Sequence, residues 1–468
     1  MTPQLEVEVC IVGGGPAGAV LARRLANLGH SVVIVERSMH TTRVRGETLH
    51  AGAWPLLDHL GITREVLDTG ARSVHRSLVR WGDDAVAIRE HEVPQLAVLR
   101  PRLDAMLLGL ARRAGASVLQ PAAATGARRD GDTWVIAVEC AGEPLEVRAR
   151  LLGDASGRVA WRRAARAQIS ARTSAMRGMW SGPALPAEAR IEAIDDGWLW
   201  GAPAAPGRYA VIAVVDADTP LGLGRYLTAL AASQLFRDFG AKATLVEDLE
   251  YSDATGRAPR SGCEDQLFRV GDASYSLDPL SSSGLNAALG AALHASAAMH
   301  TQLLHPDREP LVRRFYEEAR RTDIARHRAS AARLYAECHW RTDPFWEQRT
   351  APRPDPAPTP SSDDTSVFDP ATTHVALSAG VSLQEMPCIA GDVIEPRLGV
   401  TSASRDRPFV WVAGVAIAPL VAPLVSRAMT PGELVATWRH VPPARHQELL
   451  DWLLRERIVR PVAGHDAA

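Results

Sequence analysis

Three glycines near the start of the chain have the spacing that binds a diphosphate. Gly13, Gly15 and Gly18 lie in the stretch GGGPAG, directly after the β-rich run VEVCIV. The first permits a tight turn, the second lets a pyrophosphate approach the backbone, and the third lets helix and strand pack closely. Glu36 follows Gly15 by 21 residues, at the end of a second apolar run, where an acid accepts from a ribose hydroxyl. These residues predict a dinucleotide site and leave NAD and FAD open.

A second stretch more than 250 positions later has residues that suit the other side of such a site. Val270-Gly271-Asp272-Ala273 reads as a strand end, and Leu277-Asp278-Pro279-Leu280 with the following serines and Gly284 as a polar turn. A helix rich in small residues is expected over Leu285–Leu304, where it can pack closely on a sheet. We predict that the two stretches close around one ligand; the alternative for Asp272 is a helix-capping acid.

Charged residues between the two stretches are candidates for ligand binding and acid–base chemistry. Arg45, Gly46 and Glu47 form a basic–glycine–acidic turn just before His50. Such a turn either contacts the ligand or is a solvated turn with a surface ion pair. Glu47 and His50 are the acid–base candidates, with a structural role for His50 as the alternative. Arg102 lies at the start of a predicted helix, where a cation is disfavoured unless an anion such as phosphate is near.

The positions of these residues require an α/β fold in several parts. A chain of 468 residues is long for one core, so two or three domains are expected. Tryptophans and the apolar run Ala210–Val215 predict an antiparallel sheet within residues 161–262, and Leu227–Phe239 a helix. Residues 306–350 read as helical, and the proline-rich segment 351–364 as a linker. Residues 365–468 read as a small helical or winged-helix-like module, with Thr430 capping a helix.

Composition excludes several classes of protein. Hydrophobic residues make up 46% and charged residues 23%, and the net charge of −2 gives no general attraction to nucleic acid or anionic membrane. The five cysteines have no metal-ligand or disulfide spacing, so no metal site is expected. No apolar run is long enough to cross a membrane, and the first strand starts too near Met1 for a signal peptide. A cytoplasmic location is the expectation.

These motifs together resemble a known family. GGGPAG with Glu36, the Arg45–Glu47 turn, the Arg102 helix start, Gly153-Asp154-Ala155-Ser156-Gly157 and Gly271-Asp272-Ala273 occur in the order of FAD-dependent aromatic hydroxylases and tryptophan halogenases. The stretch from Asp278 to Leu285 and the run WLWGAP at 198–203 look most like the flavoproteins that mature tryptophylquinone enzymes. Those relatives act in the biogenesis of quinohemoprotein amine dehydrogenase or lysine oxidase. The resemblance covers roughly residues 1–345.

The resemblance implies a fold and a set of domains. It implies a Rossmann-like FAD-binding domain of the aromatic hydroxylase type, an inserted antiparallel-sheet substrate domain and a small C-terminal domain. The FAD-binding domain would comprise 1–75, 96–160 and 263–305, and the substrate domain 76–95 and 161–262. The residues expected to bind FAD are Gly13, Gly15, Gly18, Glu36, Arg45, Arg102, Asp272, Pro279 and Gly284.

The resemblance also implies an activity: hydroxylation of an indole ring, on a tryptophan of a partner polypeptide, through a C4a-hydroperoxide of the flavin. O2 would be a co-substrate, and electrons would come from NAD(P)H or a separate reductase, since no second GxGxxG is present. The C-terminal domain is the expected docking module for the partner. The alternatives are a flavin-dependent halogenase and a flavin reductase or dehydrogenase that acts on a small molecule.

The halogenase alternative meets a difficulty in the residues. Halogenases of this family carry a WxWxIP pattern and a catalytic lysine before it. Trp198 and Trp200 match the tryptophans, but Gly201-Ala202-Pro203 replaces the rest, and the only lysine, Lys242, comes after the motif. The two tryptophans share one face of a strand and are either pocket wall or core.

Overall fold

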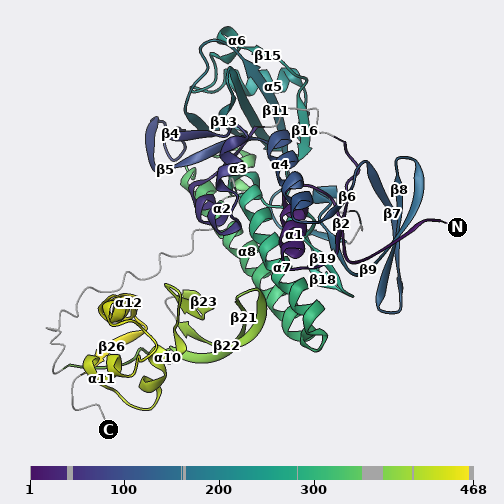
Figure 1. Cartoon of the computed structure of the whole chain (residues 1–468). Helices are drawn as coiled ribbons and strands as arrows, with labels where there is room; N and C mark the ends of the chain where they lie inside the picture. The colour runs from purple at the N-terminus through teal and green to yellow at the C-terminus, as the bar shows by residue number, and fades with distance from the viewer. Residues whose placement is uncertain are drawn as a thin grey trace. The chain divides into compact units, whose positions relative to one another are not determined.

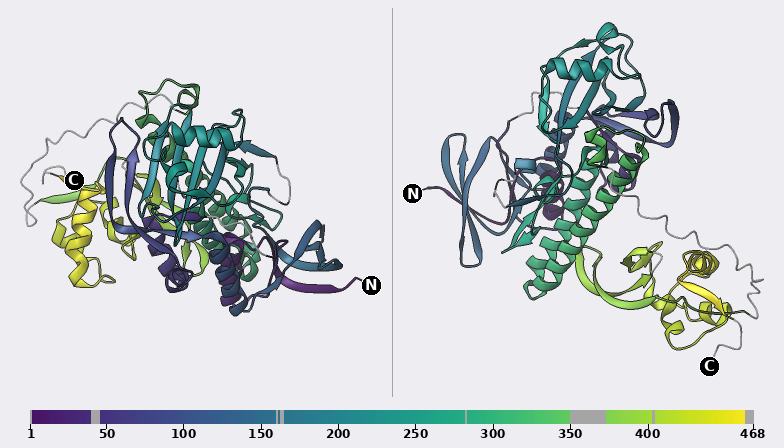
Figure 2. Two further views of the ribbon diagram at one scale, coloured as in Figure 1. Left: turned by 90° about the horizontal axis from the view of Figure 1, so that it is seen from above. Right: turned by 180° about the vertical axis from the view of Figure 1, so that it is seen from behind.

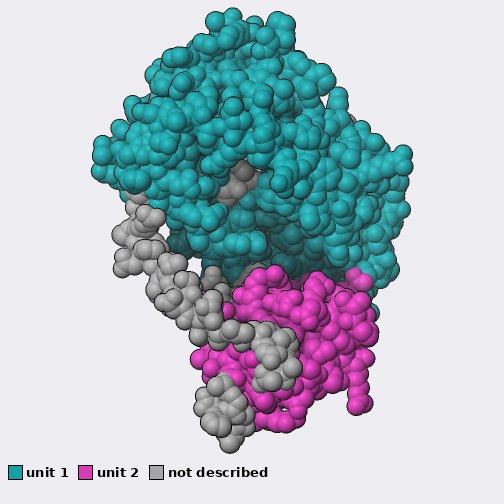
Figure 3. Space-filling view, turned by 90° about the vertical axis from the view of Figure 1, so that its left-hand side faces the viewer, with its two compact units in different colours: residues 1–307, 316–353 teal, residues 308–315, 354–468 magenta. Residues whose placement is uncertain are grey.

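The computed structural model describes residues 2–39, 46–159, 161, 165–281, 283–349, 373–402 and 405–462 (Figure 1). The chain forms two compact units, coloured separately in Figure 3: Met1–Asp307 with Tyr316–Arg353, and Arg308–Phe315 with Pro354–Ala468. Among the described residues, no helix has both the length and the apolar character that a membrane crossing requires. The predicted linker 351–364 lies outside the described residues.

The first sheet of unit 1 brings together the loops that carry the glycines and Asp272. Strand β1 (Gln4–Val12) pairs in parallel with β2 (Val32–Val35) and β9 (Glu143–Asp154), and β9 pairs in parallel with β19 (Leu267–Arg269). The second half of β1 and all of β2 are buried, as expected where both faces of a parallel sheet are covered. The sheet is completed by β6 (Ser117–Leu119), β7 (Ala122–Asp130), β8 (Thr133–Cys140) and β18 (Cys263–Glu264).

Three helices pack around the carboxyl edge of this sheet. Helix α1 (Pro16–Asn27) contacts both α4 (Arg100–Arg113) and α7 (Gly284–Leu304). The alanine-rich sequence of α7 permits this close packing, and the predicted helix over Leu285–Leu304 is confirmed. Short helices α2 (Trp54–Leu60) and α3 (Thr63–Asp68) lie between β3 and β4, two strands of the second sheet. The turns η3 (Gly271–Ala273) and η4 (Pro279–Ser281) lie between β19 and α7.

The second sheet of unit 1 is the predicted antiparallel sheet, and it forms a separate layer in Figures 1 and 2. Its order is β15-β11-β14-β13-β12-β4-β5-β3, with β16 also paired to β11. All of its pairs are antiparallel except β12 with β4. The strands are β3 (Gly46–Leu49), β4 (Arg72–Arg80), β5 (Ala87–Leu99), β11 (Thr173–Ser181), β12 (Ala189–Ile194), β13 (Gly197–Ala205), β14 (Arg208–Asp216), β15 (Thr244–Leu245) and β16 (Glu250–Asp253). Strand β3 and the end of β5 fall in the ranges 1–75 and 96–160, so those ranges contribute to both sheets.

The predicted helix Leu227–Phe239 is wrong. Helix α5 spans Leu223–Ala231, and α6 spans Phe239–Lys242. Between them the Ser233 hydroxyl and the Leu235 amide both donate to Glu192 Oε2, at 2.8 and 2.7 Å. Glu192 is fully buried, so its carboxylate takes the amide that would have continued the helix.

The segment after α7 anchors helices on the second sheet. Helix α8 (Glu309–Glu337) is followed by α9 (Pro344–Glu347). Trp346 in α9 is fully buried, and its indole donates to the Ile194 carbonyl at 2.9 Å. Arg349 donates to Asp216 Oδ1 at 2.7 Å. A two-stranded sheet, β10 (Arg166–Gln168) with β17 (Arg257–Pro259), completes unit 1.

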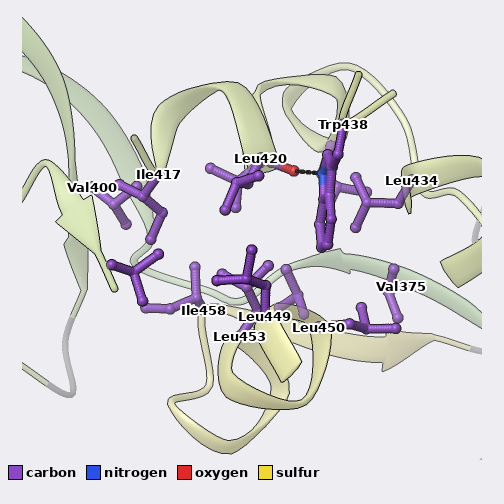
Figure 4. Packing of buried hydrophobic residues seen from close by; sticks show 14 of the residues in the cluster. Val375, Val400, Ile417, Leu420, Leu434, Trp438, Leu449, Leu450, Leu453 and Ile458 are labelled. Carbon is purple, nitrogen blue, oxygen red and sulfur yellow. Dashed lines mark hydrogen bonds between the residues drawn. The ribbon is translucent and has the colours of Figure 1, made fainter. Parts of the chain in front are cut away.

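Unit 2 has a hydrophobic core of its own (Figure 4). The Trp438 indole is buried and donates to the Leu420 carbonyl at 3.0 Å, with Leu434, Leu449 and Leu453 in the same cluster. Thr430 and Glu433 form the capping box that opens α11, as predicted. The unit is not purely helical. Residues 382–402 form a long β-hairpin. Its elements are β20 (His374–Leu377), β21 (Ser382–Ala390), β22 (Val393–Ser402), β23 (Arg405–Phe409), β24 (Trp411–Val412), β25 (Val415–Ala416), α10 (Ala418–Val421), α11 (Pro431–Ala436), α12 (His446–Arg455) and β26 (Val459–Val462).

Candidate functional site

The glycine-rich loop between β1 and α1 has the backbone that its sequence predicts. Gly13 has φ +108°, and a Cβ atom there would lie 2.4 Å from the Ala155 carbonyl oxygen. A Cβ on Gly18 would collide with the Gly13 carbonyl oxygen, so this glycine lets α1 begin close to the strand. A Cβ on Gly15 would meet no atom within 4 Å. Gly13 and Gly18 are therefore required by packing, whereas Gly15 faces open space.

Glu36 follows β2 and contacts this loop. Its carboxylate accepts from the Gly14 amide at 2.6 Å and from the Ser38 amide at 2.8 Å. These bonds hold the acid at the carboxyl end of β2, beside the loop that would receive a diphosphate. This is the position that its predicted role as a ribose ligand requires.

The second predicted stretch touches the first. Gly271 has φ +61°, and a Cβ there would lie 2.8 Å from the Ala17 Cβ in α1. Arg158 pairs with Asp272 through Nε and Oδ2 at 3.5 Å, and Arg166 donates to the Asp272 carbonyl at 2.6 Å. The predicted proximity of two stretches more than 250 positions apart is therefore present in the structure.

Asp272 is partly exposed, and burial affects its carboxyl group. Its side chain is 38% exposed, yet burial raises its pKa, and Arg158 only partly offsets that effect. Gly284, at the start of α7, has no atom within 4 Å of a Cβ position.

The two predicted arginines and Glu47 have different surroundings. Arg45 lies outside the described residues. Arg102 is exposed and donates to the Thr69 carbonyl at 3.3 Å. The arginine that faces the site is Arg100, which donates to Glu47 Oε1 and Asp104 Oδ1, each at 2.9 Å.

Arg100 was missed at the sequence level, although its spacing to Asp104, four residues later in a helix, was a signal for an ion pair. The charges of Glu47 and Asp104 raise the pKa of Arg100 although burial opposes this. The pKa of Asp104 is raised by burial. Glu47 is thus tied in an ion pair, which leaves its predicted acid–base role a prediction.

His50 lies beside the start of α7. Its Nδ1 accepts from the Gly52 amide at 3.1 Å and lies 3.4 Å from Asn286 Nδ2. Because Nδ1 is an acceptor, the neutral ring carries its proton on Nε2. Burial, and then the charge of Arg326, lower the pKa of His50, so the ring is neutral at pH 7 and can donate through Nε2. Asn286 is a site residue that sequence reasoning missed.

The turn before α7 is joined to the second sheet through Tyr335. Tyr335 in α8 donates to Asp278 Oδ1 at 3.1 Å and receives the Trp198 indole N–H at 3.4 Å. Trp198 is 3% exposed and packs in a cluster with Leu280, so it is core. Trp200, on the same face, is only partly buried beside that cluster, and Pro279 is partly exposed.

The residues fit a bound FAD. The oxygen atoms Thr48 Oγ1, Asp154 Oδ2 and Asn286 Oδ1 are buried and have no hydrogen-bond partner among the described residues. Buried polar atoms are normally satisfied, so these three call for a ligand or water. Together with the open Cβ positions at Gly15 and Gly284, these unpartnered atoms favour a bound ligand at this site. In the part of the chain that the structure describes, no group of residues suits a metal ion.

A βαβ unit with this loop, closed by Gly271-Asp272 and a helix start, defines a class of dinucleotide-binding flavoproteins. Residues 6–325 match the family described as FAD binding domain, and the chain belongs to that family. The match agrees with the FAD-dependent oxidoreductase that the motifs predicted.

Three known proteins show the extent of the likeness. The tryptophan 2-halogenase of Chondromyces crocatus is 28% identical over 319 residues, which are 63% of this chain and 61% of the halogenase. The solved structure of the peptidyl tryptophan dihydroxylase QhpG, essential for tryptophylquinone cofactor biogenesis, has TM-score 0.76 and 22% identity over 96% of this chain and 99% of its own. The flavin-dependent halogenase CmlS has TM-score 0.77 and 21% identity, over 98% and 96%. At these identities, the two structures show a shared fold.

Proposed function

We propose that this protein is a monooxygenase that hydroxylates the indole ring of a tryptophan in a partner polypeptide, during biogenesis of a quinone cofactor. O2 would be its oxidant, and NAD(P)H or a separate reductase would supply electrons. The likeness to QhpG over nearly the whole of both chains supports this substrate class.

The observation that carries the proposal concerns Lys242. It is the only lysine of the chain, its side chain is 61% exposed, and its ammonium pairs with Asp238 at 2.9 Å on α6. A lysine that relays a hypohalous acid must lie in an enclosed site between cofactor and substrate. The position of Lys242 therefore favours oxygen transfer over lysine-dependent halogenation.

Residues of this chain would hold the cofactor and position the ring. Gly13, Gly15 and Glu36 would hold the diphosphate and ribose, and Asp272 the other side of FAD. The amides at the start of α7 would stabilise negative charge on the flavin ring. Bound FAD would supply, after reduction, the transfer of one oxygen atom from O2 to the ring. His50 lies beside the start of α7 and is neutral, with its proton on Nε2. It would be the proton donor at this end of the site.

The test is intact mass of candidate partner polypeptides after incubation with the protein, FAD, reductant and O2. A gain of one or two oxygen atoms on tryptophan, with matching O2 uptake, is expected. Product without O2 uptake would contradict a monooxygenase.

Halogenation is the second candidate, because the tryptophan 2-halogenase is 28% identical to this chain. The same incubation with chloride and bromide present separates the two activities. A gain of a halogen atom would overturn the proposal.

A further inference from the structure

A groove lies at the edge of the second sheet where β15 and β16 meet β11, at the top of Figure 1. Its volume is about 910 Å³. It is lined by Leu223, Leu245, Val246, Glu247, Asp248, Leu249 and Tyr251. None of these residues belongs to the FAD site described above.

Apolar side chains gather around this groove on the outside of the protein. Leu223 is 50% exposed, Tyr251 48% and Val246 38%. Leu227, one turn after Leu223 in α5, is 41% exposed, although the same helix buries Tyr226 on its inner face. Single exposed apolar residues are ordinary, but several of them around one hollow are typical of a binding surface.

The groove is bordered by a strand with an open edge. Within the described residues, β16 pairs with β11 and with no other strand. β15 pairs with the other end of β11, and Val246–Leu249 connects the two. Arg158 donates to the Asp253 carbonyl at the end of β16, so an extended peptide could add to the rest of this edge.

Two carboxylates, those of Glu247 and Asp248, line the groove. In the described parts of the chain, Glu247 and Asp248 form no ion pair. Arg177 of β11 is already paired with Glu250 at 3.2 Å, and Lys242 of α6 with Asp238 at 2.9 Å. A ligand with apolar and basic groups would complement the groove in both respects.

We propose that this groove docks an extended segment of the partner polypeptide in which Arg or Lys alternates with aliphatic side chains. The inference rests on the proposed function, since it assumes a polypeptide substrate. Leu245 and Leu249 pack with Trp180 on one face of the sheet, whereas Trp198 and Leu280 pack together on the other. The groove therefore lies on the opposite face of the sheet from Trp198 and Leu280. It would bind a segment of the polypeptide other than the one that carries the reacting tryptophan.

Binding of labelled peptides to the full-length protein with FAD tests the proposal. One fluorescein-labelled decapeptide alternates Val or Leu with Arg, and a second has Glu in place of Arg. Fluorescence anisotropy is expected to show the Arg peptide bound about 10-fold more tightly or better. Equal affinity, or tighter binding of the Glu peptide, would overturn the proposal.

Two variants locate the binding. The double variant Glu247→Gln/Asp248→Asn and the variant Leu223→Ser/Tyr251→Ser are each expected to weaken the Arg peptide about 10-fold. Ile88→Ser is the matched control, because Ile88 is 62% exposed on β5, and it should leave affinity unchanged. All three should keep the flavin absorbance spectrum. Loss in the control, or no loss in the groove variants, contradicts the proposal.

Hydroxylation of the partner polypeptide distinguishes this inference from the proposed function. If wild type and Glu247→Gln/Asp248→Asn hydroxylate it with the same KM, the groove does not dock it, and the proposed function stands. If the Arg peptide binds the groove but no polypeptide gains oxygen, the docking site stands and the proposed function fails.

Discussion

Gly13 and Gly15 lie in one loop but have different physical roles. Gly13 has a positive φ and no room for a Cβ, whereas Gly15 has φ −68° and open space. Gly13→Ala is expected to lower the free energy of unfolding of the FAD-free protein by about 2 kcal/mol or more. Gly15→Ala should change it by less than about 1 kcal/mol and weaken FAD binding by about 10-fold or more, since its methyl group would occupy ligand space. Urea unfolding measures the stability of the two variants, and flavin fluorescence titration measures their affinity for FAD. Equal losses of stability would contradict a packing role for Gly13 alone.

Arg100 and Arg102 form a second matched pair. Arg100→Met removes the cation between Glu47 and Asp104, whose side chains are only 26% and 22% exposed. The loss should be about 3 kcal/mol, because two partly buried carboxylates remain close together. Arg102→Met, at an exposed position, should cost less than about 0.5 kcal/mol. Urea unfolding at pH 7 measures the free energy of unfolding of both variants. A larger loss of stability for Arg102→Met would contradict the assignment of Arg100 as the arginine that pairs with Glu47 and Asp104.

His50 predicts a pH effect. Its pKa lies below the ordinary value of 6.5, so between these two values the unfolded chain binds a proton that the folded chain does not. The free energy of unfolding should therefore fall as the pH falls below about 6.5. Arg326→Gln should raise the pKa of His50 without restoring it fully, because burial is the larger cause. NMR titration of the histidines measures the pKa of His50, and the exposed Arg328→Gln is the control. An unchanged pKa of His50 in Arg326→Gln would contradict a contribution from the charge of Arg326.

At the scale of elements, α9 fixes the end of the helical segment on the second sheet. Trp346 is fully buried and bonded to Ile194, while Trp340, six residues earlier, is 38% exposed. Trp346→Ala is expected to cost about 3–5 kcal/mol, from the lost burial and the cavity. Trp340→Ala should cost less than about 1 kcal/mol. Thermal and urea unfolding compare them, and similar losses would show that α9 does not anchor this segment.

At the scale of the whole molecule, unit 2 has its own core and unit 1 contains every described residue of the candidate FAD site. Deletion of residues 365–468 is therefore expected to leave the FAD dissociation constant within about threefold, because no site residue is removed. The proposed docking role of unit 2 adds the expectation that polypeptide binding weakens. Flavin titration and co-elution with the polypeptide measure the two effects; loss of FAD would contradict the separation.

Local sequence patterns predicted the family of the protein and the proximity of Gly271 to the glycine-rich loop. The glycine spacing, the acid after β2 and the Gly271-Asp272 turn are local features, because each depends on the backbone of a few neighbouring residues. Local patterns also predicted α7 and the Thr430 cap. The helix predicted over Leu227–Phe239 failed for a nonlocal reason, since the buried carboxylate of Glu192 comes from another strand.

The side chains that meet at the candidate site come from distant parts of the chain, so local patterns could not identify them. Arg100 and Arg102 occupy the same helix turn, and pattern alone could not distinguish the one that faces Glu47 from the one that faces solvent. Asn286 reaches His50 across 236 positions, and Tyr335 joins Asp278 to Trp198 from a third element. Such contacts depend on how sheets and helices pack, and packing depends on the whole chain rather than on the residues near each side chain.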